Sequence, residues 1–323
     1  MELETIVAPA PAVNASPAPA RPAAATWPRL KPPPFTPADW IGALPYLALH
    51  LGCLLVLVVG WSPAALVVAA SLYVLRMFAL TGFYHRYFAH RTFQTSRGWQ
   101  LVFAVLGTSA VQQGPLWWAA HHRIHHRSSD QAEDAHSPRV WGFLWSHVGW
   151  FLSHTNVRTR IEMVPDLAQF PELRFLNRFH VLVAIGLGLA LYGLGASLAL
   201  VAPDLGTSGA QMLVWGFFVS TVVLHHGSFT INSLSHLFGS QRYATGDSSR
   251  NNALLALITM GEGWHNNHHH YPGAVRQGFF WWELDLTYYG LYLLGRLGVI
   301  RDLRPVPARV LRAAPARCGL PGR

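Results

Sequence analysis

The chain carries very little charge for its length and almost no cysteine or lysine. Of its 323 residues, 12% are charged and 51% are hydrophobic, so the charged fraction is about half of that in soluble proteins. Two cysteines, Cys53 and Cys318, exclude a disulfide framework and a thiolate metal site. The net charge of +9 is accompanied by no nucleic-acid-binding motif, which argues against a nucleic-acid partner. This composition indicates a membrane protein.

Four apolar stretches are long enough to cross a bilayer, which requires about 20 residues. They cover residues 41–60, 63–84, 181–202 and 212–234, and Arg76 is the one charged residue within them. Short connections join the first stretch to the second and the third to the fourth. The sequence therefore predicts an all-α integral membrane protein with four transmembrane helices.

The distribution of basic residues predicts how these helices are oriented. Three of the 24 Lys and Arg residues precede the first stretch, ten lie between the second and third, and ten follow the fourth. Because cytoplasmic segments carry an excess of Lys and Arg, we expect both termini and the central segment to be cytoplasmic. The bias toward Arg, Ala and Pro is typical of GC-rich bacterial genomes, which favours a bacterial inner membrane.

Two further apolar stretches, 99–118 and 279–300, are predicted to be interfacial or re-entrant helices rather than crossings. Polar residues, glycine and proline interrupt the first at 112–115, and Glu283, Asp285 and Arg296 interrupt the second. We expect these segments to contribute to a cytoplasmic helical cap. The predicted organisation is a disordered Ala/Pro-rich tail (1–38), a membrane domain (39–306) and a C-terminal tail (307–323).

Histidine is abundant, with 18 residues, and most of it is clustered. The clusters are His85-Arg-Tyr-Phe-Ala-His90, His122-Arg-Ile-His-His126, Asn232-Ser-Leu-Ser-His236 and His265-Asn-Asn-His-His269. The predicted topology places all of them on the cytoplasmic side. Imidazole is the commonest metal ligand in proteins, and clusters without thiolates suit Zn, Cu, Fe or Ni.

The spacing within each cluster predicts how the rings are presented. His122, His125 and His126 stand at i, i+3 and i+4, which is one face of a helix, and the cluster from His265 repeats this pattern. His85 and His90 are about 140° apart on a regular α-helix. These two must therefore flank a helix end or serve different metals. The set predicts two metal ions.

These motifs identify a family. The chain resembles the membrane-bound acyl desaturases of the stearoyl-CoA 9-desaturase family over roughly residues 41–306. The similarity includes Trp145-Ser-His-Val-Gly-Trp150 and Gly261-Glu-Gly-Trp-His-Asn-Asn-His-His269. The resemblance implies a pair of iron ions, with Asn232 acting through a water. The implied histidine ligands are His85, His90, His122, His125, His126, His236, His265, His268 and His269.

The resemblance also implies a reaction. An acyl desaturase uses O₂ and two electrons to remove two hydrogens from adjacent methylene groups, here from a saturated acyl-CoA at carbon 9 to give a cis double bond in unsaturated fatty acid biosynthesis. The irons are the catalytic centre, and no separate general base is expected. The chain has no cytochrome-like His-Pro-Gly-Gly segment, so we expect a separate electron donor of the ferredoxin or cytochrome b5 type. Tyr73 and Met77 are predicted to line the acyl tunnel and to set chain length.

Other functions remain as alternatives. Animal relatives carry charged pairs where this chain has Ala120-His121 and His154-Thr155, so an acyl group on a membrane lipid or on a carrier protein is an alternative to acyl-CoA. A lipid-chain hydroxylase could use the same irons. A membrane metal transporter is a remote alternative, because transporters place their ligands near the middle of the membrane.

Several residues near the clusters have weaker predicted roles. His121 and His270 fall outside the family register and are predicted to lie behind the ligands or in solvent. His136 and His147 could orient ligands. Glu262 precedes His265 by three residues, within reach of the free ring N–H of a ligand.

Overall fold

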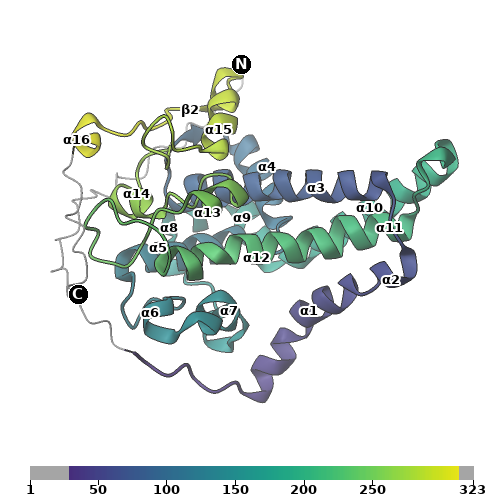
Figure 1. Cartoon of the computed structure of the whole chain (residues 1–323), viewed down its shortest axis with the longest axis horizontal. Helices are drawn as coiled ribbons and strands as arrows, with labels where there is room; N and C mark the ends of the chain where they lie inside the picture. The colour runs from purple at the N-terminus through teal and green to yellow at the C-terminus, as the bar shows by residue number, and fades with distance from the viewer. Residues whose placement is uncertain (1–28, 313–323) are drawn as a thin grey trace, which may run out of the picture.

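The computed structural model describes residues 29–312 and is predominantly helical (Figure 1). Four helices are long and apolar enough to cross a membrane: Pro37–Val59, Pro63–Ala89, His180–Val201 and Gly209–His236. Each lies within five residues of its predicted bounds at either end. The prediction of an all-α membrane protein with four candidate spans is confirmed. Residues 1–28 and 313–323, which hold most of the two predicted tails and Cys318, lie outside the described residues.

The helices and helical turns follow one another along the chain with few strands between them. They are α1 (Pro37–Cys53), α2 (Val56–Val59), α3 (Pro63–Phe78), η1 (Ala79–Ala89), α4 (Arg97–Thr108), α5 (Pro115–Ser128), α6 (Pro138–Trp141), η2 (Trp145–Gly149), α7 (Trp150–Leu152), η3 (His154–Asn156), η4 (Ile161–Met163), α8 (Pro165–Ala168), α9 (Pro171–Arg178), α10 (His180–Val201), η5 (Pro203–Leu205), α11 (Gly209–Leu213), η6 (Val214–Val219), α12 (Ser220–Ser233), η7 (Leu234–His236), α13 (Ala253–Ile258), α14 (His265–His270), α15 (Leu286–Arg296) and α16 (Ala308–Leu311). Strands β1 (Gln94–Thr95) and β2 (Ile300–Arg301) pair antiparallel.

Local sequence explains where the first two spans begin. Thr36 caps α1 in a capping box with Asp39, and Pro37 occupies the first turn, where a missing N–H costs nothing. Ser62 caps α3, ahead of Pro63, by accepting a hydrogen bond from the backbone N–H of Ala65. Gly60 adopts a positive φ of 66° between the two helices, a conformation that glycine tolerates. A short turn therefore joins the first two spans.

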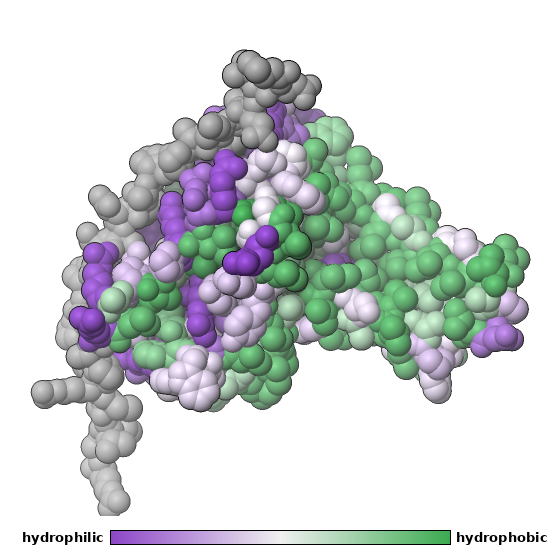
Figure 2. All heavy atoms as spheres, turned by 90° about the horizontal axis from the view of Figure 1, so that it is seen from above, coloured by the Kyte–Doolittle hydropathy of each residue, from purple (hydrophilic) through white to green (hydrophobic). Residues whose placement is uncertain are grey.

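The long helices form the apolar half of the molecule, and the short helices gather at one end as a cap (Figure 1). Helix α3 packs on α12, α10 packs on α11, and α1 contacts η6 and α12. Many apolar side chains on the spans face outward, such as Leu57 and Leu200, which are 84% and 83% exposed. Figure 2 shows the corresponding apolar surface on the part of the molecule opposite the polar cap. Such a surface is stable in lipid rather than in water.

The two stretches predicted as interfacial helices are not candidate spans, which agrees with four crossings. Their internal structure differs from the prediction. The first consists of two helices, α4 and α5, because the chain turns between them with positive φ at Val111 and Gln113. In the second, only α15 is helical, since Asp285 caps that helix by accepting from the backbone N–H of Tyr288. The first predicted helix is interrupted between Thr108 and Pro115, and the second begins only at Leu286.

Arg76, the charged residue within the spans, is buried and connects helices. Its guanidinium donates to the hydroxyls of Ser220 and Thr221 on α12, at 2.7 and 2.8 Å. It also donates to the carbonyl of Ser109 beyond α4. A buried guanidinium needs such partners because there is no water in the bilayer core to replace them. Arg76 thus fixes α3 against α12 below the cap.

The core beneath the cap is aromatic and centres on η1. The rings of Phe83 and Phe103 stack at 3.9 Å, and Tyr87 stacks on Phe93 at 5.2 Å. These contacts hold η1 against α4 and against the segment that leads to β1. They fix the position of the first histidine cluster.

Candidate metal centre

Helices α5 and α14 present three histidines each. His122, His125 and His126 share one face of α5, and His265, His268 and His269 share one face of α14, as their spacing predicted. The two faces meet: the Nε2 atoms of His126 and His268 are 2.9 Å apart, and those of His125 and His269 are 3.2 Å apart.

His85 and His90 are brought together by a π-helix. The segment η1 is π-helical, and the backbone N–H of His90 donates to the carbonyl of His85 at 3.2 Å, five residues earlier. Such an i to i+5 bond stacks the two residues one turn apart. His90 is the C-terminal cap of η1, so the first of the two predicted alternatives, flanking a helix end, is the observed one.

All nine predicted histidine ligands converge in two adjacent groups. The five-histidine group is His85, His90, His122, His126 and His268. The four-histidine group is His125, His236, His265 and His269. In each group, every histidine contributes one ring nitrogen, and these nitrogens all lie within 4.8 Å of one another. Residues far apart in the sequence therefore form two sites that could each hold one metal ion.

Short contacts between ring nitrogens define the centre of each group. In the five-histidine group, Nε2 of His90 lies 2.8 Å from Nε2 of His122, and Nε2 of His85 lies 3.0 Å from Nε2 of His268. In the four-histidine group, His236 at the end of η7 meets His265 at 3.0 Å. The Nε2 atoms thus point inward.

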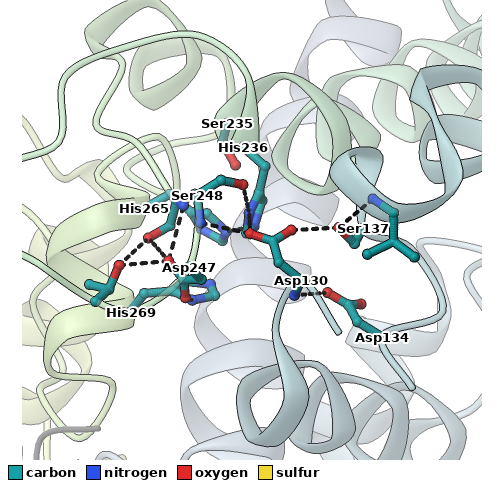
Figure 3. A network of polar contacts seen from close by, with 12 residues as sticks. Asp130, Asp134, Ser137, Ser235, His236, Asp247, Ser248, His265 and His269 are labelled. Atoms are coloured by element: carbon teal, nitrogen blue, oxygen red, sulfur yellow. Dashed lines mark hydrogen bonds and ion pairs between the residues drawn. The ribbon is translucent and has the colours of Figure 1, made fainter. Parts of the chain in front are cut away.

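Carboxylates hold the outer nitrogens of several rings (Figure 3). Asp134 lies 3.0 Å from Nδ1 of His125, and Asp247 lies 2.6 Å from Nδ1 of His269. Asp130 lies 3.7 Å from Nδ1 of His236, where Ser248 is closer, at 3.3 Å. A carboxylate on Nδ1 fixes the ring orientation and makes the opposite nitrogen a better ligand.

Within residues 29–312, the five-histidine group has one such carboxylate. Glu262 pairs with Nδ1 of His85 and also with Arg86 at 3.0 Å. Arg86 in turn pairs with Asp285, and both carboxylates are buried. Burial raises the pKa of Glu262, but His85 and Arg86 lower it further, so that its pKa lies below the usual value. Glu262 is therefore an anion at neutral pH.

The aspartates behind the four-histidine group are ionised as well. Burial raises the pKa of Asp134, but His125 and His136 outweigh it, and the pKa lies below its usual value. The pKa of Asp130 is lowered to about 2, because His236 and hydrogen bonds from Ser137 and Ser248 outweigh burial. Burial and the neighbouring imidazoles keep the pKa of His269 well below 6.5. The four-histidine group thus combines the neutral ring of His269 with anionic carboxylates.

This arrangement fits a cation between the rings. A carboxylate only accepts hydrogen bonds, so Nδ1 of His125 and Nδ1 of His269 each carry a proton that faces the carboxylate. Their Nε2 atoms face each other across 3.2 Å, and each Nε2 without a proton presents a lone pair to the other ring. Two lone pairs at this distance repel unless a positive charge lies between them. A metal ion satisfies this requirement, and the donors are all imidazole nitrogens.

The other predicted site residues lie around these groups. Asn232 lines the same cavity as His125 and His265. Met77 also lines this cavity. The hydroxyl of Tyr73 donates to the carbonyl of Ile258 at 2.5 Å, and Tyr73 is not among the described residues that line the cavity.

Histidines outside the family register stay outside both groups. His270 stacks on Tyr243 at 4.1 Å. His121 is buried, 7% exposed, rather than in solvent.

His136 lies 4.5 Å from His125, ring to ring, whereas His147 contacts Ser233 and His226. Of the predicted orienting histidines, only His136 adjoins a histidine group.

Asp130, Asp134 and Asp247 were missed in the sequence. A signal was available, because acidic residues number only 15 in the chain, and Asp130 and Asp134 follow the second histidine cluster within a few residues. Glu262 was noted for its proximity to His265, but it contacts His85 instead. Sequence distance did not identify its partner.

A cavity of about 420 Å³ reaches from the histidine groups into the spans. This volume lies within the range of about 300–1,000 Å³ that is typical of ligand pockets. Its walls come from α1, η1, α5, α10 and α12, and include Leu49, Leu80, Ala184 and Phe217. None of the lining residues within 29–312 is Lys or Arg. An apolar chain can lie in this space with one part next to the metal centre.

Comparison with known proteins adds independent information on this site. A fatty acid desaturase family model matches residues 38–292. The chain belongs to the fatty acid desaturase family. The matched range includes every histidine of the two groups, and these groups are compatible with a histidine-cluster metal site.

Individual desaturases are similar along most of the chain. An sn-1 stearoyl-lipid 9-desaturase of Anabaena variabilis is 36% identical, with 82% of this chain and 94% of the relative covered. An acyl-CoA 5-desaturase of Anemone leveillei is 37% identical (81% and 78% covered). A chloroplastic palmitoyl-monogalactosyldiacylglycerol delta-7 desaturase of Arabidopsis thaliana is 34% identical (77% and 65%). These desaturases are named for different carriers and different double-bond positions.

Proposed function

We propose that this protein is an O₂-dependent acyl desaturase that inserts a cis double bond at carbon 9 of a saturated acyl chain, with two iron ions as its cofactor. The observation that carries the proposal is the pair of histidine groups beside an apolar cavity. Imidazole donors suit iron. When bound, the irons would activate O₂, which is the oxidant; O₂ takes two hydrogens from unactivated methylene groups, together with two external electrons and two protons, and is reduced to two waters.

The protein's own residues have distinct roles in this proposal. The five-histidine group holds one iron, and the four-histidine group holds the other, with Asn232 assisting through a water. Glu262, Asp134 and Asp247 hold Nδ1–H of their histidines and keep each ring aimed at its iron. The apolar wall positions the chain and excludes water from it. Electrons come from a separate donor of the ferredoxin or cytochrome b5 type.

The cavity favours an acyl chain linked to a membrane lipid. The phosphates of CoA call for cations at the binding site, yet no described lining residue is Lys or Arg. The walls include the spans α1, α10 and α12, which are accessible from a bilayer. The similar sn-1 stearoyl-lipid 9-desaturase of Anabaena variabilis supports the same substrate class and position.

Acyl-CoA is the second candidate substrate. Arg160 acts electrostatically on His121, which lines the cavity, and Arg158 and Arg160 are both exposed. These cations could bind phosphates outside the cavity. The similar acyl-CoA 5-desaturase of Anemone leveillei supports this alternative.

The predicted orientation is part of the proposal. Both termini and the cap face the cytoplasm, in a bacterial inner membrane, on the basis of the distribution of Lys and Arg. All nine histidines lie at one end of the spans rather than at their middle, which favours an enzyme over a metal transporter.

Product analysis tests the function. The protein is expressed in a host without a desaturase of its own, and its lipids are analysed by gas chromatography and mass spectrometry. We expect a cis double bond at carbon 9 in stearoyl or palmitoyl chains. Hydroxylated chains would support the hydroxylase instead, and saturated lipids alone would refute both. Membranes supplied with labelled stearoyl-CoA or labelled stearoyl phospholipid then identify the carrier.

A further inference from the structure

One wall of the cavity carries polar atoms that have no hydrogen-bond partner within the described part of the chain. They are Nε2 of His121, Nδ1 of His136 and Nε1 of Trp150. Each side chain is more than nine-tenths buried. The nearest carboxylate oxygen to Nδ1 of His136, on Asp134, is 3.6 Å away, beyond hydrogen-bond distance. Unpaired buried polar atoms are costly, so three of them on one wall indicate that a ligand pairs with them.

The three rings form a continuous surface that leads away from the four-histidine group. The ring of His136 lies 4.5 Å from that of His125, Trp150 lies 4.9 Å from His136, and His121 lies 5.7 Å from Trp150. The exposed residue Arg160 acts electrostatically on His121 at the far end. We call His121, His136 and Trp150 the polar wall. It runs from the metal centre toward the surface of the cap.

The rest of the cavity has a different character. Leu49, Leu80, Ala184 and Phe217 line it within the spans. His225 contributes an unpaired Nδ1 there, and the metal-centre residue His265 contributes another, whereas the polar wall has three such atoms ring against ring. A ligand with a long apolar part and one polar end matches this division, with its polar end on the polar wall.

We propose that the polar wall binds the carbonyl group that links the acyl chain to its carrier. This inference rests on the proposed function. The indole N–H of Trp150 can only donate, so it selects an acceptor such as the carbonyl oxygen of an ester or thioester. The imidazoles accept from, or donate to, the carrier atoms next to that carbonyl. The chain then passes the histidine groups and ends in the apolar part of the cavity.

This assignment has a consequence for where the double bond forms. If the carbonyl is held on the polar wall, its separation from the metal centre selects the methylene pair. The double bond is then counted from the carbonyl end, and chains of 16 and 18 carbons are desaturated at the same carbon number. Trp150 is a specificity-determining residue in this scheme rather than a catalytic one.

Ligand binding without turnover tests the proposal. Purified full-length protein with its iron is given a stearoyl glycerol ester or the matching octadecyl ether, which lacks only the carbonyl oxygen. A second arm compares stearoyl-CoA with its octadecyl thioether. We expect the carbonyl compound to bind about five- to tenfold more tightly, as one hydrogen bond allows, and the arm with the larger preference identifies the carrier.

Two tryptophan variants provide a matched comparison. Trp150→Phe keeps the ring, removes the unpaired N–H, and is expected to abolish the preference for the carbonyl compound. Trp117→Phe is the control, because Trp117 stacks on Trp150 in the same wall region, but its N–H already donates to the carbonyl of Asn156 at 2.8 Å. The control should keep the preference.

The outcomes separate this inference from the proposed function. No preference in the wild-type protein, or an equal preference in Trp150→Phe and wild type, overturns the carbonyl site. The wild-type measurement alone can overturn the carbonyl site, so the test does not depend on the folding of a variant. A protein that shows the preference yet forms no unsaturated product refutes desaturation while supporting the carbonyl site.

Discussion

The two histidine groups differ in the charges that stand behind their rings. The five-histidine group has one carboxylate, Glu262, and that charge is shared with Arg86. The four-histidine group has one ring fewer, but Asp130, Asp134 and Asp247 lie behind it. The four-histidine group therefore has fewer rings and more negative charge behind them. The five-histidine group has more rings and less negative charge.

This difference predicts that metal ions bound in the two groups would not be equivalent. Carboxylates behind a histidine raise its basicity and strengthen its bond to a metal. We expect the four-histidine group to depend strongly on its aspartates. The five-histidine group should depend more on the rings themselves, since Arg86 neutralises part of its carboxylate charge.

The largest effect should follow from removing a ring in either group. His122→Ala in the five-histidine group and His265→Ala in the four-histidine group should each lower desaturation by more than about 100-fold, beyond the loss typical of outer partners. Replacing any other of the nine should do the same. Product formation in a desaturase-deficient host measures the effect.

His121→Ala and His270→Ala are the controls for that series. Both residues adjoin ligands in sequence but lie outside the two groups. Desaturation should persist in both variants, with weaker substrate binding in His121→Ala. If His122→Ala remained active, or if His121→Ala lost iron, the assignment of ligands would be wrong.

Changing the carboxylates should distinguish the two groups. Asp247→Asn removes the charge behind His269 and should weaken iron binding about 10- to 100-fold at one of the two sites. Glu262→Gln should have a smaller effect at the other site. Iron retained per chain during titration with a chelator is the measurement. Asp204→Asn, on exposed η5 at the far end of the spans, is the control; equal losses in all three variants would contradict the comparison.

The metal-free protein should be destabilised by mild acid. Burial, followed by neighbouring rings, keeps the pKa values of His122, His126 and His269 well below 6.5. Below pH about 6.5 the unfolded chain binds protons at these residues and the folded chain does not, so stability is complete above that pH and falls beneath it. Thermal unfolding of chelated protein at pH 7.5 and 5.5 should show a lower Tm at pH 5.5. A pH-independent Tm would contradict the buried, neutral state of these rings.

The smallest predicted effect concerns chain length. Tyr73 lies behind the cavity lining, with its hydroxyl on the carbonyl of Ile258, and Met77 lines the cavity itself. Tyr73→Ala should open space beyond Met77 and shift products toward longer chains. Fatty acid profiles from a host supplied with chains of several lengths measure the shift. An unchanged profile would limit Tyr73 to helix packing.

Much of this fold follows from simple patterns in the sequence. Long apolar stretches with a single charged residue predicted the four spans, because a bilayer requires length and apolarity. The i, i+3, i+4 spacing on α5 and α14 gave two of the ligand faces. Local periodicity was sufficient to predict which residues share a face where the segment is a regular α-helix.

Other features depend on contacts that the sequence does not display. The π-helical turn that brings His85 near His90 cannot be read from α-helical periodicity. The pairing of Glu262 with His85 joins residues 177 positions apart in the chain. The unpaired N–H of Trp150 is visible only once its neighbours are placed. Tertiary packing, rather than local pattern, decides each of these.

The number of iron ions per chain tests the central claim most directly. Metal analysis of the purified wild-type protein should give two irons per chain. His122→Ala and His265→Ala should each lose one iron first, from different groups, as the two separate histidine sets require. A wild-type protein that holds a single iron per chain, or two ions that are both lost when either group is changed, would contradict a centre built from two distinct sites.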